Sequence, residues 1–377
     1  MNTRNSHMPA IFITGIAGFI GSLIAASLKL QGFPVFGVDN MSTGYQENLP
    51  LFAKGKNWWE LELATRTNIA QLAKYMRVAK EAGNGQLIIV HTAAPAYDAN
   101  SHLLMGLVTE GVSVGTVTTV AAAIRAGATR FINFSSMARY EPVNMDLHKA
   151  AIGYREDDLI GGMTPYGMAK VQAEQVMMMS MERHGIPWVN IVLHNVVGMG
   201  QQYNNPARSV VAMWLNLRLH GKPIIIHGDG TQERAYSPWE TIRDILLELI
   251  ITPRYQGLTI NVGPDPEHSM SLNELAVLVY KVAGDLTGNP LAIADDPPVY
   301  IPTDNIASMK TAVCNHDRIK MLFGSIPNPN YEETLSRMGA QMLEVEKDFD
   351  YSVFERPDLG KTALHPVYRD QKMTIKN

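Results

Sequence analysis

The stretch Thr14-Gly15-Ile16-Ala17-Gly18-Phe19-Ile20-Gly21 follows the apolar run 10–13 and leads into the helical pattern of residues 20–31. Glycines with this spacing at a strand-to-helix turn are typical of dinucleotide-binding loops. The first glycine allows the tight turn, the second lets the backbone approach a pyrophosphate, and the third lets helix and strand pack closely. The free N–H groups that begin the helix then face the anion. The alternative is a tight turn that binds no ligand.

Short apolar runs alternate with helix-length segments through the first half of the chain. The runs expected to be buried strands are residues 10–14, 34–39, 87–91, 130–134 and 188–193, with a further one at 258–262. The helical segments between them are residues 20–31, 69–81, 103–125 and 166–184. Continuous apolar strands separated by helices indicate a parallel sheet that is covered on both faces. We therefore predict an α/β fold with a doubly wound, Rossmann parallel sheet.

The second half of the chain is less regular, and it predicts a smaller α/β substrate domain that is partly interleaved with the first. Ser271 and Glu274 have the spacing of a capping box at the start of a helix over residues 271–283, and 209–220 is another helix candidate. The predicted cofactor domain is 1–196, with returning segments at about 235–262. The predicted substrate domain is 197–234 with 263–345, and 346–377 is a C-terminal extension of no assigned function.

Composition and charge narrow the class of protein. Of 377 residues, 46% are hydrophobic and 18% are charged, which allows a large core and excludes a disordered chain. The net charge of −4 gives no strong field for nucleic acid or an anionic membrane, and no uninterrupted apolar run approaches the ~18 residues of a membrane span. With one cysteine, no metal-ligand spacing and no secretory signal, we expect a cytoplasmic protein without a metal, a nucleic-acid partner or a membrane partner.

Asp39 indicates which dinucleotide the glycine loop binds. It ends the strand expected at residues 34–39, about 20 residues after the loop, where an acid can hydrogen-bond a ribose 2′-OH. A carboxylate there repels a 2′-phosphate, so NAD is favoured over NADP. The alternative is a solvated loop acid.

Three residues form a candidate catalytic set. Tyr166 and Lys170 stand four apart, so on a helix they share one face. A nearby ammonium lowers the pKa of a tyrosine, which a phenol needs in order to act as a base near neutral pH. Ser136 follows the strand at 130–134, at the sheet edge where open α/β folds bind ligands. The alternatives are an amphipathic surface pair and a serine that only satisfies backbone groups.

These motifs resemble those of the extended short-chain dehydrogenase/reductases, in the NAD-dependent nucleotide-sugar epimerase/dehydratase family, and they are UDP-glucose 4-epimerase-like. The matching motifs follow the family's order over residues 10–340: Gly15-x-x-Gly18-Phe19-Ile20-Gly21, Asp39-Asn40-Met41-Ser42-Thr43-Gly44, His91-Thr92-Ala93-Ala94, Ser136 with Tyr140, Tyr166-x-x-x-Lys170, Asn195-Val196-Val197-Gly198 and Gly228 to Arg234.

The resemblance implies a set of site residues. The implied cofactor-binding residues are Gly15, Ala17, Gly18, Phe19, Ile20, Gly21, Asp39, Asn40, Ser42, Thr43, Gly44, Glu62, Leu63, Ala93, Ala94, Lys170 and Leu193. The implied substrate contacts are Ser136, Tyr166, His194, Asn195 and Arg234. By similarity, Tyr166 is the catalytic base and acid, Lys170 lowers its pKa and holds the nicotinamide ribose, and Ser136 bridges Tyr166 and the sugar.

The implied activity is 4-epimerisation of a nucleotide sugar. Tyr166 takes the proton of the sugar 4-OH while hydride passes from C4 to NAD, and the 4-keto sugar turns before the hydride returns to its other face. Met137 and Ala138 stand where family 4,6-dehydratases carry an acidic pair, which disfavours dehydration. The resemblance implies a UDP-hexose or a UDP-N-acetylhexosamine, since it aligns the small Ala312 with a position where many epimerases carry a bulkier residue, which leaves room for a substituted sugar.

Other outcomes within the same family stay open. These are a 4,6-dehydratase, a UDP-glucuronate decarboxylase and a 4-keto reductase, and a non-catalytic NAD-binding sensor is the alternative outside catalysis. The resemblance also implies a homodimer, formed through the helices at residues 103–125 and 166–184.

Overall fold

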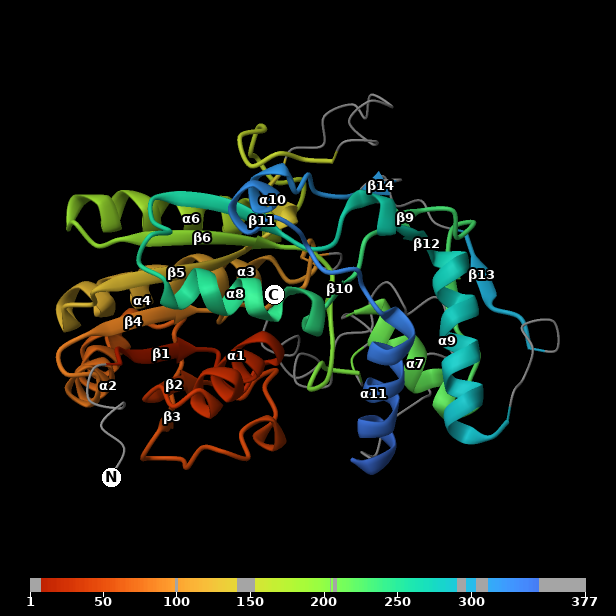
Figure 1. Cartoon of the computed structure of the whole chain (residues 1–377), viewed down its shortest axis with the longest axis horizontal. Helices are drawn as coiled ribbons and strands as arrows, with labels where there is room; N and C mark the ends of the chain where they lie inside the picture. Colours follow the sequence, from red (N-terminus) through yellow and green to blue (C-terminus); the bar gives the residue numbers. More distant parts are fainter. Residues whose placement is uncertain are drawn as a thin grey trace, which may run out of the picture.

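The computed structural model describes residues 8–98, 101–140, 153–203, 205, 209–289, 296–302 and 311–345. A large sheet with flanking helices makes up one lobe, and three helices with short strands make up a smaller lobe beside it (Figure 1). The predicted C-terminal extension, 346–377, lies outside the described residues.

Seven parallel strands form the central sheet in the order β11-β6-β5-β4-β1-β2-β3. Their bounds are β1 Ala10–Thr14, β2 Val35–Asp39, β3 Trp58–Glu60, β4 Leu87–His91, β5 Arg130–Ser136, β6 Trp188–Leu193 and β11 Leu258–Val262. Strands β1, β2, β4 and β6 are buried along their whole length, which explains their continuous apolar sequence. The doubly wound parallel sheet was therefore predicted correctly.

The strand order reverses at β1, and this reversal places the ligand site. Ile11 of β1 pairs with Val35 of β2 on one side and with Ile88 of β4 on the other. The connections after β1 and β4 therefore leave in opposite directions, and a crevice opens between them beyond the carboxyl ends of the strands.

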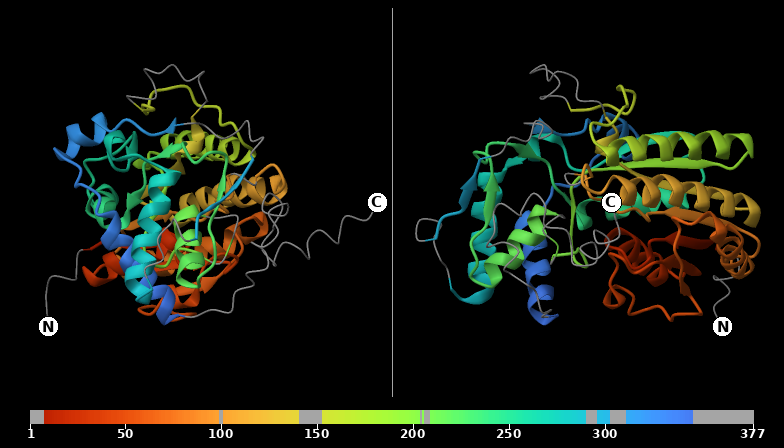
Figure 2. Two further views of the ribbon diagram at one scale, coloured as in Figure 1. Left: turned by 90° about the vertical axis from the view of Figure 1, so that its right-hand side faces the viewer. Right: turned by 180° about the vertical axis from the view of Figure 1, so that it is seen from behind.

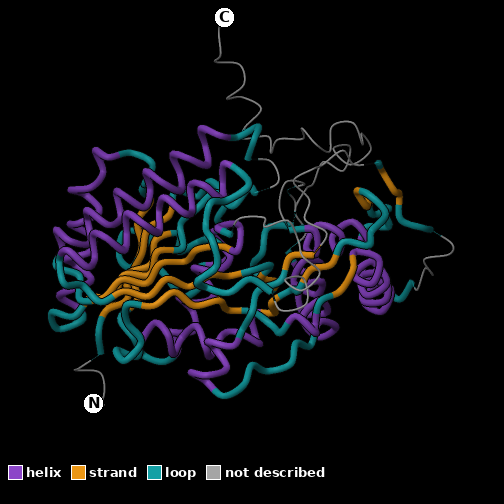
Figure 3. Tube along the Cα trace, turned by 90° about the horizontal axis from the view of Figure 1, so that it is seen from above, coloured by secondary structure: helices purple, strands orange, loops and turns teal. Residues whose placement is uncertain are grey.

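Helices cover both faces of the sheet (Figure 3). On one face, α1 (Phe19–Leu30) and α8 (Trp239–Ile251) share a core with Ile11 and Ile13 of β1. On the other face lie α2 (Ile69–Ala82), α4 (Gly115–Ala126) and α6 (Pro165–Arg183), with core residues that include Ala10 and Phe12. The alternation along β1 divides the apolar side chains between the two cores.

A continuous helical stretch runs from Met105 to Ala126. It consists of α3 (Met105–Val108), a π-helical turn (Thr109–Val114) and α4, and α4 lies beside α6 (Figure 2). Among the described residues, it is the one helix that is long and apolar enough to cross a membrane, with 22 residues and a mean hydropathy of 1.5. The sequence analysis predicted a helix at residues 103–125, but not one of membrane-spanning length and hydropathy. Much of α4 is buried against the sheet, as in a core helix.

The smaller lobe has a core of its own, which includes Trp214 and Leu215. Its helices are α7 Val210–Leu219, α9 Leu272–Thr287 and α11 Tyr331–Glu344. Its short strands pair as β8 (Ile225–His227) with β13 (Val299–Ile301), and as β9 (Glu233–Arg234) with β12 (Met270–Ser271) and β14 (Thr311–Ala312). The Ser271–Glu274 capping box is present as predicted.

The remaining elements are short strands, one short helix and 3-10 turns. They are β7 Val196–Val197, β10 Ser237–Pro238, α10 Asp317–Phe323 and the 3-10 turns Gln46–Asn48, Arg66–Asn68, Met137–Arg139 and Pro266–His268. The chain returns to the sheet through α8 and β11, which lie within the returning segment expected at about 235–262. Helix α10 also packs on β11, although its residues lie within the predicted substrate domain.

Candidate active site

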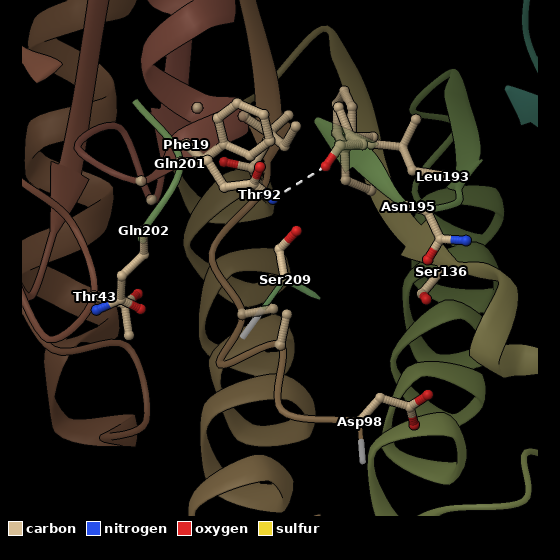
Figure 4. A pocket seen from close by; sticks show the side chains of 18 of the residues that line it. Phe19, Thr43, Thr92, Asp98, Ser136, Leu193, Asn195, Gln201, Gln202 and Ser209 are labelled. Atoms are coloured by element: carbon tan, nitrogen blue, oxygen red, sulfur yellow. Dashed lines mark hydrogen bonds between the residues drawn. The ribbon is translucent and has the colours of Figure 1, made fainter. Parts of the chain in front are cut away.

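Two cavities lie at the carboxyl edge of the sheet. One has a volume of about 490 Å³ (Figure 4), and the other about 560 Å³. Both are lined by Gly15, Gly18, Thr43, Thr92 and Ala94, so they adjoin and form one groove across the glycine loop.

The glycine loop has the geometry that its sequence predicts. Gly15 adopts φ +76°, which favours glycine, and a Cβ there would lie 2.9 Å from the backbone of Ala93. A Cβ on Gly21 would lie 2.1 Å from the carbonyl oxygen of Gly15, which only glycine avoids. Helix α1 starts directly after Gly18, so its free N–H groups face the junction of the two cavities.

Asp39 lines the 560 Å³ cavity, and its carboxylate is held in one orientation. One oxygen accepts a hydrogen bond from the Ala17 N–H at 2.9 Å, and the other accepts one from the Met41 N–H at 2.8 Å. Burial raises the pKa of Asp39, and these backbone hydrogen bonds oppose the rise. Each oxygen keeps a second lone pair with which to accept a hydrogen bond from a ribose hydroxyl.

The wall beyond Asp39 is polar and acidic. Asn40 donates to a carboxylate oxygen of Glu62 at 2.7 Å, and the hydroxyl of Ser42 donates to the side-chain oxygen of Asn40 at 2.7 Å. Glu110, from the π-helical turn, lines the same cavity. Negative charge at this end of the groove suits a ribose with free hydroxyls and disfavours a phosphate.

We expect Asp39→Asn to weaken the binding of NAD by about tenfold and to narrow the preference for NAD over NADP, because a hydrogen bond to a charged group is replaced by a weaker one. Calorimetric titration of cofactor-free protein with both dinucleotides measures the two changes. Glu110→Gln is the matched control: it removes one negative charge from the same cavity without touching the Asp39 contacts. An unchanged preference in Asp39→Asn would contradict the role of this carboxylate.

His91 has a structural place at the end of β4. Its ring nitrogens form hydrogen bonds with the hydroxyls of Thr14, at 2.7 Å, and Thr116, at 2.9 Å. Burial lowers its pKa to about 3, so the ring is neutral at physiological pH. It ties β1, β4 and α4 together behind the groove.

Tyr166 and Lys170 lie on the first turns of α6, facing the 490 Å³ cavity. Helix α6 is capped by Thr164, whose hydroxyl accepts a hydrogen bond from the Gly167 N–H at 3.0 Å. The Lys170 ammonium donates to the carbonyl of Phe134 at 2.8 Å and lies 5.8 Å from the centre of the Tyr166 ring. Burial lowers the pKa of Lys170 to about 8, while the carboxylate of Glu174 opposes that shift.

Ser136 and Ser135, which end β5, have different surroundings. Ser136 lines the cavity with Tyr166, and its oxygen accepts a hydrogen bond from the Ala138 N–H at 3.2 Å. Ser135 is buried and its hydroxyl donates to Glu174. Both serines line the cavity, but the Ser135 hydroxyl is engaged with Glu174, and the groove brings Ser136, Tyr166 and Lys170 into one wall beside the glycine loop.

A family model agrees with this arrangement: the NAD dependent epimerase/dehydratase family model matches residues 11–262. The chain belongs to this family. NAD is therefore its cofactor, and the groove suits NAD, with Asp39 at one end, the N-terminus of α1 in the middle and Lys170 at the other end. When bound, NAD supplies a hydride acceptor and donor.

Known relatives show the range of the family. A UDP-glucose 4-epimerase of Mycolicibacterium smegmatis is 26% identical over 335 residues, which are 86% of this chain and 96% of that protein. A trifunctional UDP-glucose 4,6-dehydratase/3,5-epimerase/reductase of Arabidopsis thaliana is 26% identical over 261 residues, and the chain spans 37% of its length. The solved structure of Thermus thermophilus UDP-glucose 4-epimerase in complex with NAD has a TM-score of 0.73 at 21% identity, covers 89% of this chain and 99% of that one, and shares the fold.

Most residues that the sequence predicted for this epimerase/dehydratase site line the groove. The residues found there are Gly15, Gly18, Phe19, Ile20, Gly21, Asp39, Asn40, Ser42, Thr43, Glu62, Leu63, Ala93, Ala94, Ser136, Tyr166, Lys170, Leu193 and Asn195. The exceptions are Ala17, Gly44, His194 and Arg234. Ala17 is fully buried, and a Cβ on Gly44 would lie 2.8 Å from its Cβ, so these two support the groove from behind.

His194, predicted as a substrate contact, lines neither cavity, and that contact stays a prediction. At the end of β6 the side chains alternate, so Leu193 and Asn195 face the cavity while His194 turns away. Its ring is buried with its centre 5.4 Å from that of His316, and a Cβ on Gly263 would lie 2.2 Å from its Nε2. Burial lowers the pKa of His194 to about 4, so it is neutral at physiological pH.

Arg234 does not line the 490 Å³ cavity, although it was predicted to contact the substrate's diphosphate. It lies on β9, and its guanidinium donates to the carbonyl of Glu233 at 2.7 Å. Burial lowers its pKa, while Tyr236 and Asp98, which do line the cavity, raise it electrostatically. Arg234 therefore lies near the cavity, and its contact with a diphosphate stays a prediction.

The structure adds cavity residues that the sequence pattern did not reveal. Four of them, Asp98, Gln201, Gln202 and Ser209, come from loops after β4 and between β7 and α7. Asp98 follows a strand end, a place where polar side chains commonly meet ligands, so it could have been found. The other three sit in a polar loop whose position depends on how the smaller lobe packs.

Proposed function

We propose that this chain is an NAD-dependent nucleotide-sugar 4-epimerase, with a UDP-hexose or UDP-N-acetylhexosamine as its substrate. The observation that carries the proposal is the wall formed by Ser136, Tyr166 and Lys170 inside a cavity that adjoins the dinucleotide groove. Transient oxidation at C4 needs one group that takes and returns a proton, and this wall supplies it.

Each of the three residues has a part that its surroundings support. Tyr166 takes the proton of the sugar 4-OH and later returns it. Lys170, fixed by the Phe134 carbonyl, places its ammonium beside the ring and stabilises the phenolate form. Ser136 faces the same cavity and hydrogen-bonds the reacting hydroxyl.

Dehydration is disfavoured by the two residues directly after Ser136. Met137 and Ala138 form a 3-10 turn with Arg139, and neither side chain can exchange a proton. Met137 packs against Tyr140 and Tyr154, and Ala138 packs against the cluster that holds Tyr166. The proton-exchanging pair that would remove the C6 hydroxyl is therefore missing next to the catalytic serine.

The test is to release and identify the bound dinucleotide and to follow UDP-glucose, UDP-galactose and their N-acetyl forms by chromatography and NMR. We expect bound NAD, interconversion at C4, and retention of a deuterium label placed at C4, because the hydride returns to the carbon it left. A stable keto product would indicate dehydration, and carbon dioxide release would indicate decarboxylation. Bound NAD with no turnover of any nucleotide sugar would support the sensor instead.

A further inference from the structure

Asp98 stands out in the wall of the 490 Å³ cavity. Among the described residues that line this cavity, it is the one carboxylate; the wall also holds the Lys170 ammonium and neutral polar side chains such as Ser209 and Asn195. Figure 4 shows it across the cavity from Phe19 and Thr43, on the side of Ser136. It lies away from the glycine loop, in the part of the cavity that the proposed function assigns to the sugar and not to the cofactor.

The carboxylate is anchored through one oxygen. The hydroxyl of Thr164 donates to Asp98 Oδ1 at 2.5 Å and itself caps α6 by accepting from the Gly167 N–H. Because Thr164 stands two residues before Tyr166, Asp98 is fixed beside the start of the catalytic helix, whose dipole favours a negative charge there. Within the described part of the chain, no hydrogen bond reaches its Oδ2.

The charges around Asp98 show what this oxygen can recognise. Asp98 lines the cavity and part of its surface is exposed; burial raises its pKa, and Thr164, His102 and Arg234 oppose that rise. It is therefore an acceptor that interacts electrostatically with the Arg234 guanidinium, whose charge it compensates in part. A sugar hydroxyl or amide N–H can donate to Oδ2, whereas a second carboxylate meets a like charge.

We propose that Asp98 is a specificity-determining residue that accepts a hydrogen bond from the sugar and excludes nucleotide sugars that carry a carboxylate, the uronates. The inference rests on the proposed nucleotide-sugar substrate and narrows it to neutral sugars. The Asp98 carboxylate also offsets the positive charge of Arg234, so that the guanidinium does not attract the carboxylate of a uronate.

Binding tests the inference without depending on turnover. Competition binding of UDP-glucose, UDP-xylose and UDP-glucuronate to the NAD-loaded protein gives three dissociation constants. UDP-xylose, which lacks C6, separates charge from size. We expect UDP-glucuronate to bind at least tenfold more weakly than both neutral sugars. In Asp98→Asn, UDP-glucose should weaken by about tenfold because a charged acceptor is lost, while UDP-glucuronate tightens.

A helix-capping role for Asp98 is the competing explanation, and Thr164→Val distinguishes it. This variant breaks the Asp98–Thr164 hydrogen bond and the cap but leaves the carboxylate in the cavity, so all three ligands should weaken together and their ratios should stay as in the wild type. Equal ratios in Asp98→Asn and the wild type would overturn the inference. Absence of C4 interconversion with the ratios as expected would overturn the proposed epimerase and leave the role of Asp98 standing.

Discussion

Tyr166→Phe is expected to lower the kcat of C4 interconversion by about 10³-fold, because the variant loses the group that exchanges the proton of the 4-OH. The ring itself should stay in place, since it is buried with Val108, Val112 and Ala169 in one apolar cluster. NAD should remain bound, because Asp39 and the glycine loop are unchanged. Steady-state kinetics and the dinucleotide released on denaturation measure the two properties.

Tyr140→Phe provides a matched control for this change. The Tyr140 hydroxyl donates to the buried side-chain oxygen of Asn261 at 2.6 Å and lies outside the groove walls. Its removal should cost about 1 kcal/mol in the free energy of unfolding and leave kcat within a few-fold of the wild type. A Tyr166→Phe variant that keeps a tenth or more of wild-type turnover would rule out the proposed proton transfer.

The parts of the site that the sequence predicted are those set by local geometry. Gly15 is required by its positive φ, and Gly21 is required because a Cβ there would lie 2.1 Å from the carbonyl oxygen of Gly15. Tyr166 and Lys170 share a face because of the helical repeat. Such constraints act over a few residues, so they leave a mark in the sequence. The direction of His194 depends instead on where β6 ends and on Gly263, which belongs to another part of the chain.

The same distinction between local and long-range constraints holds for the elements of the fold. Long buried strands were predicted from their apolar runs, but β3, only Trp58–Glu60, is too short for a pattern to stand out. Helix α8 was missed although Glu240, Asp244 and Glu248 repeat every four residues between apolar side chains, which is an amphipathic signal. Helix α11 was missed as well, and its packing on α7 and α9 depends on the whole smaller lobe.

Glu174 connects the catalytic helix to the end of β5. It is fully buried on α6, one turn after Lys170, and accepts hydrogen bonds from the Ser135 hydroxyl and from Arg139 Nε, the latter at 2.9 Å. Arg139 is also buried, and it donates to the carbonyl of Glu156 at 3.3 Å. The pair therefore fixes the turn that carries Ser136 against the helix that carries Tyr166 and Lys170.

Glu174→Leu is expected to lower the free energy of unfolding by about 3–5 kcal/mol, because it leaves the Arg139 guanidinium buried without a counter-charge. Urea denaturation measures the change. Glu174→Leu with Arg139→Leu should recover much of the loss, since no unpaired charge remains. Glu240→Gln, which breaks a partly exposed pair with Arg337 at 3.4 Å, should cost less than about 1 kcal/mol.

The pH dependence of turnover distinguishes two roles of Glu174: tuning the pKa of Lys170 and stabilising the fold. Burial lowers the pKa of Lys170 to about 8, and the Glu174 carboxylate opposes that lowering. In Glu174→Gln this opposition is gone, so Lys170 loses its proton at a lower pH and stabilises the Tyr166 phenolate over a narrower range. The alkaline limb of the kcat profile should therefore move to lower pH, measured where the variant is still folded. A variant that is destabilised but keeps the wild-type profile would show that Glu174 supports the fold alone, without tuning the lysine.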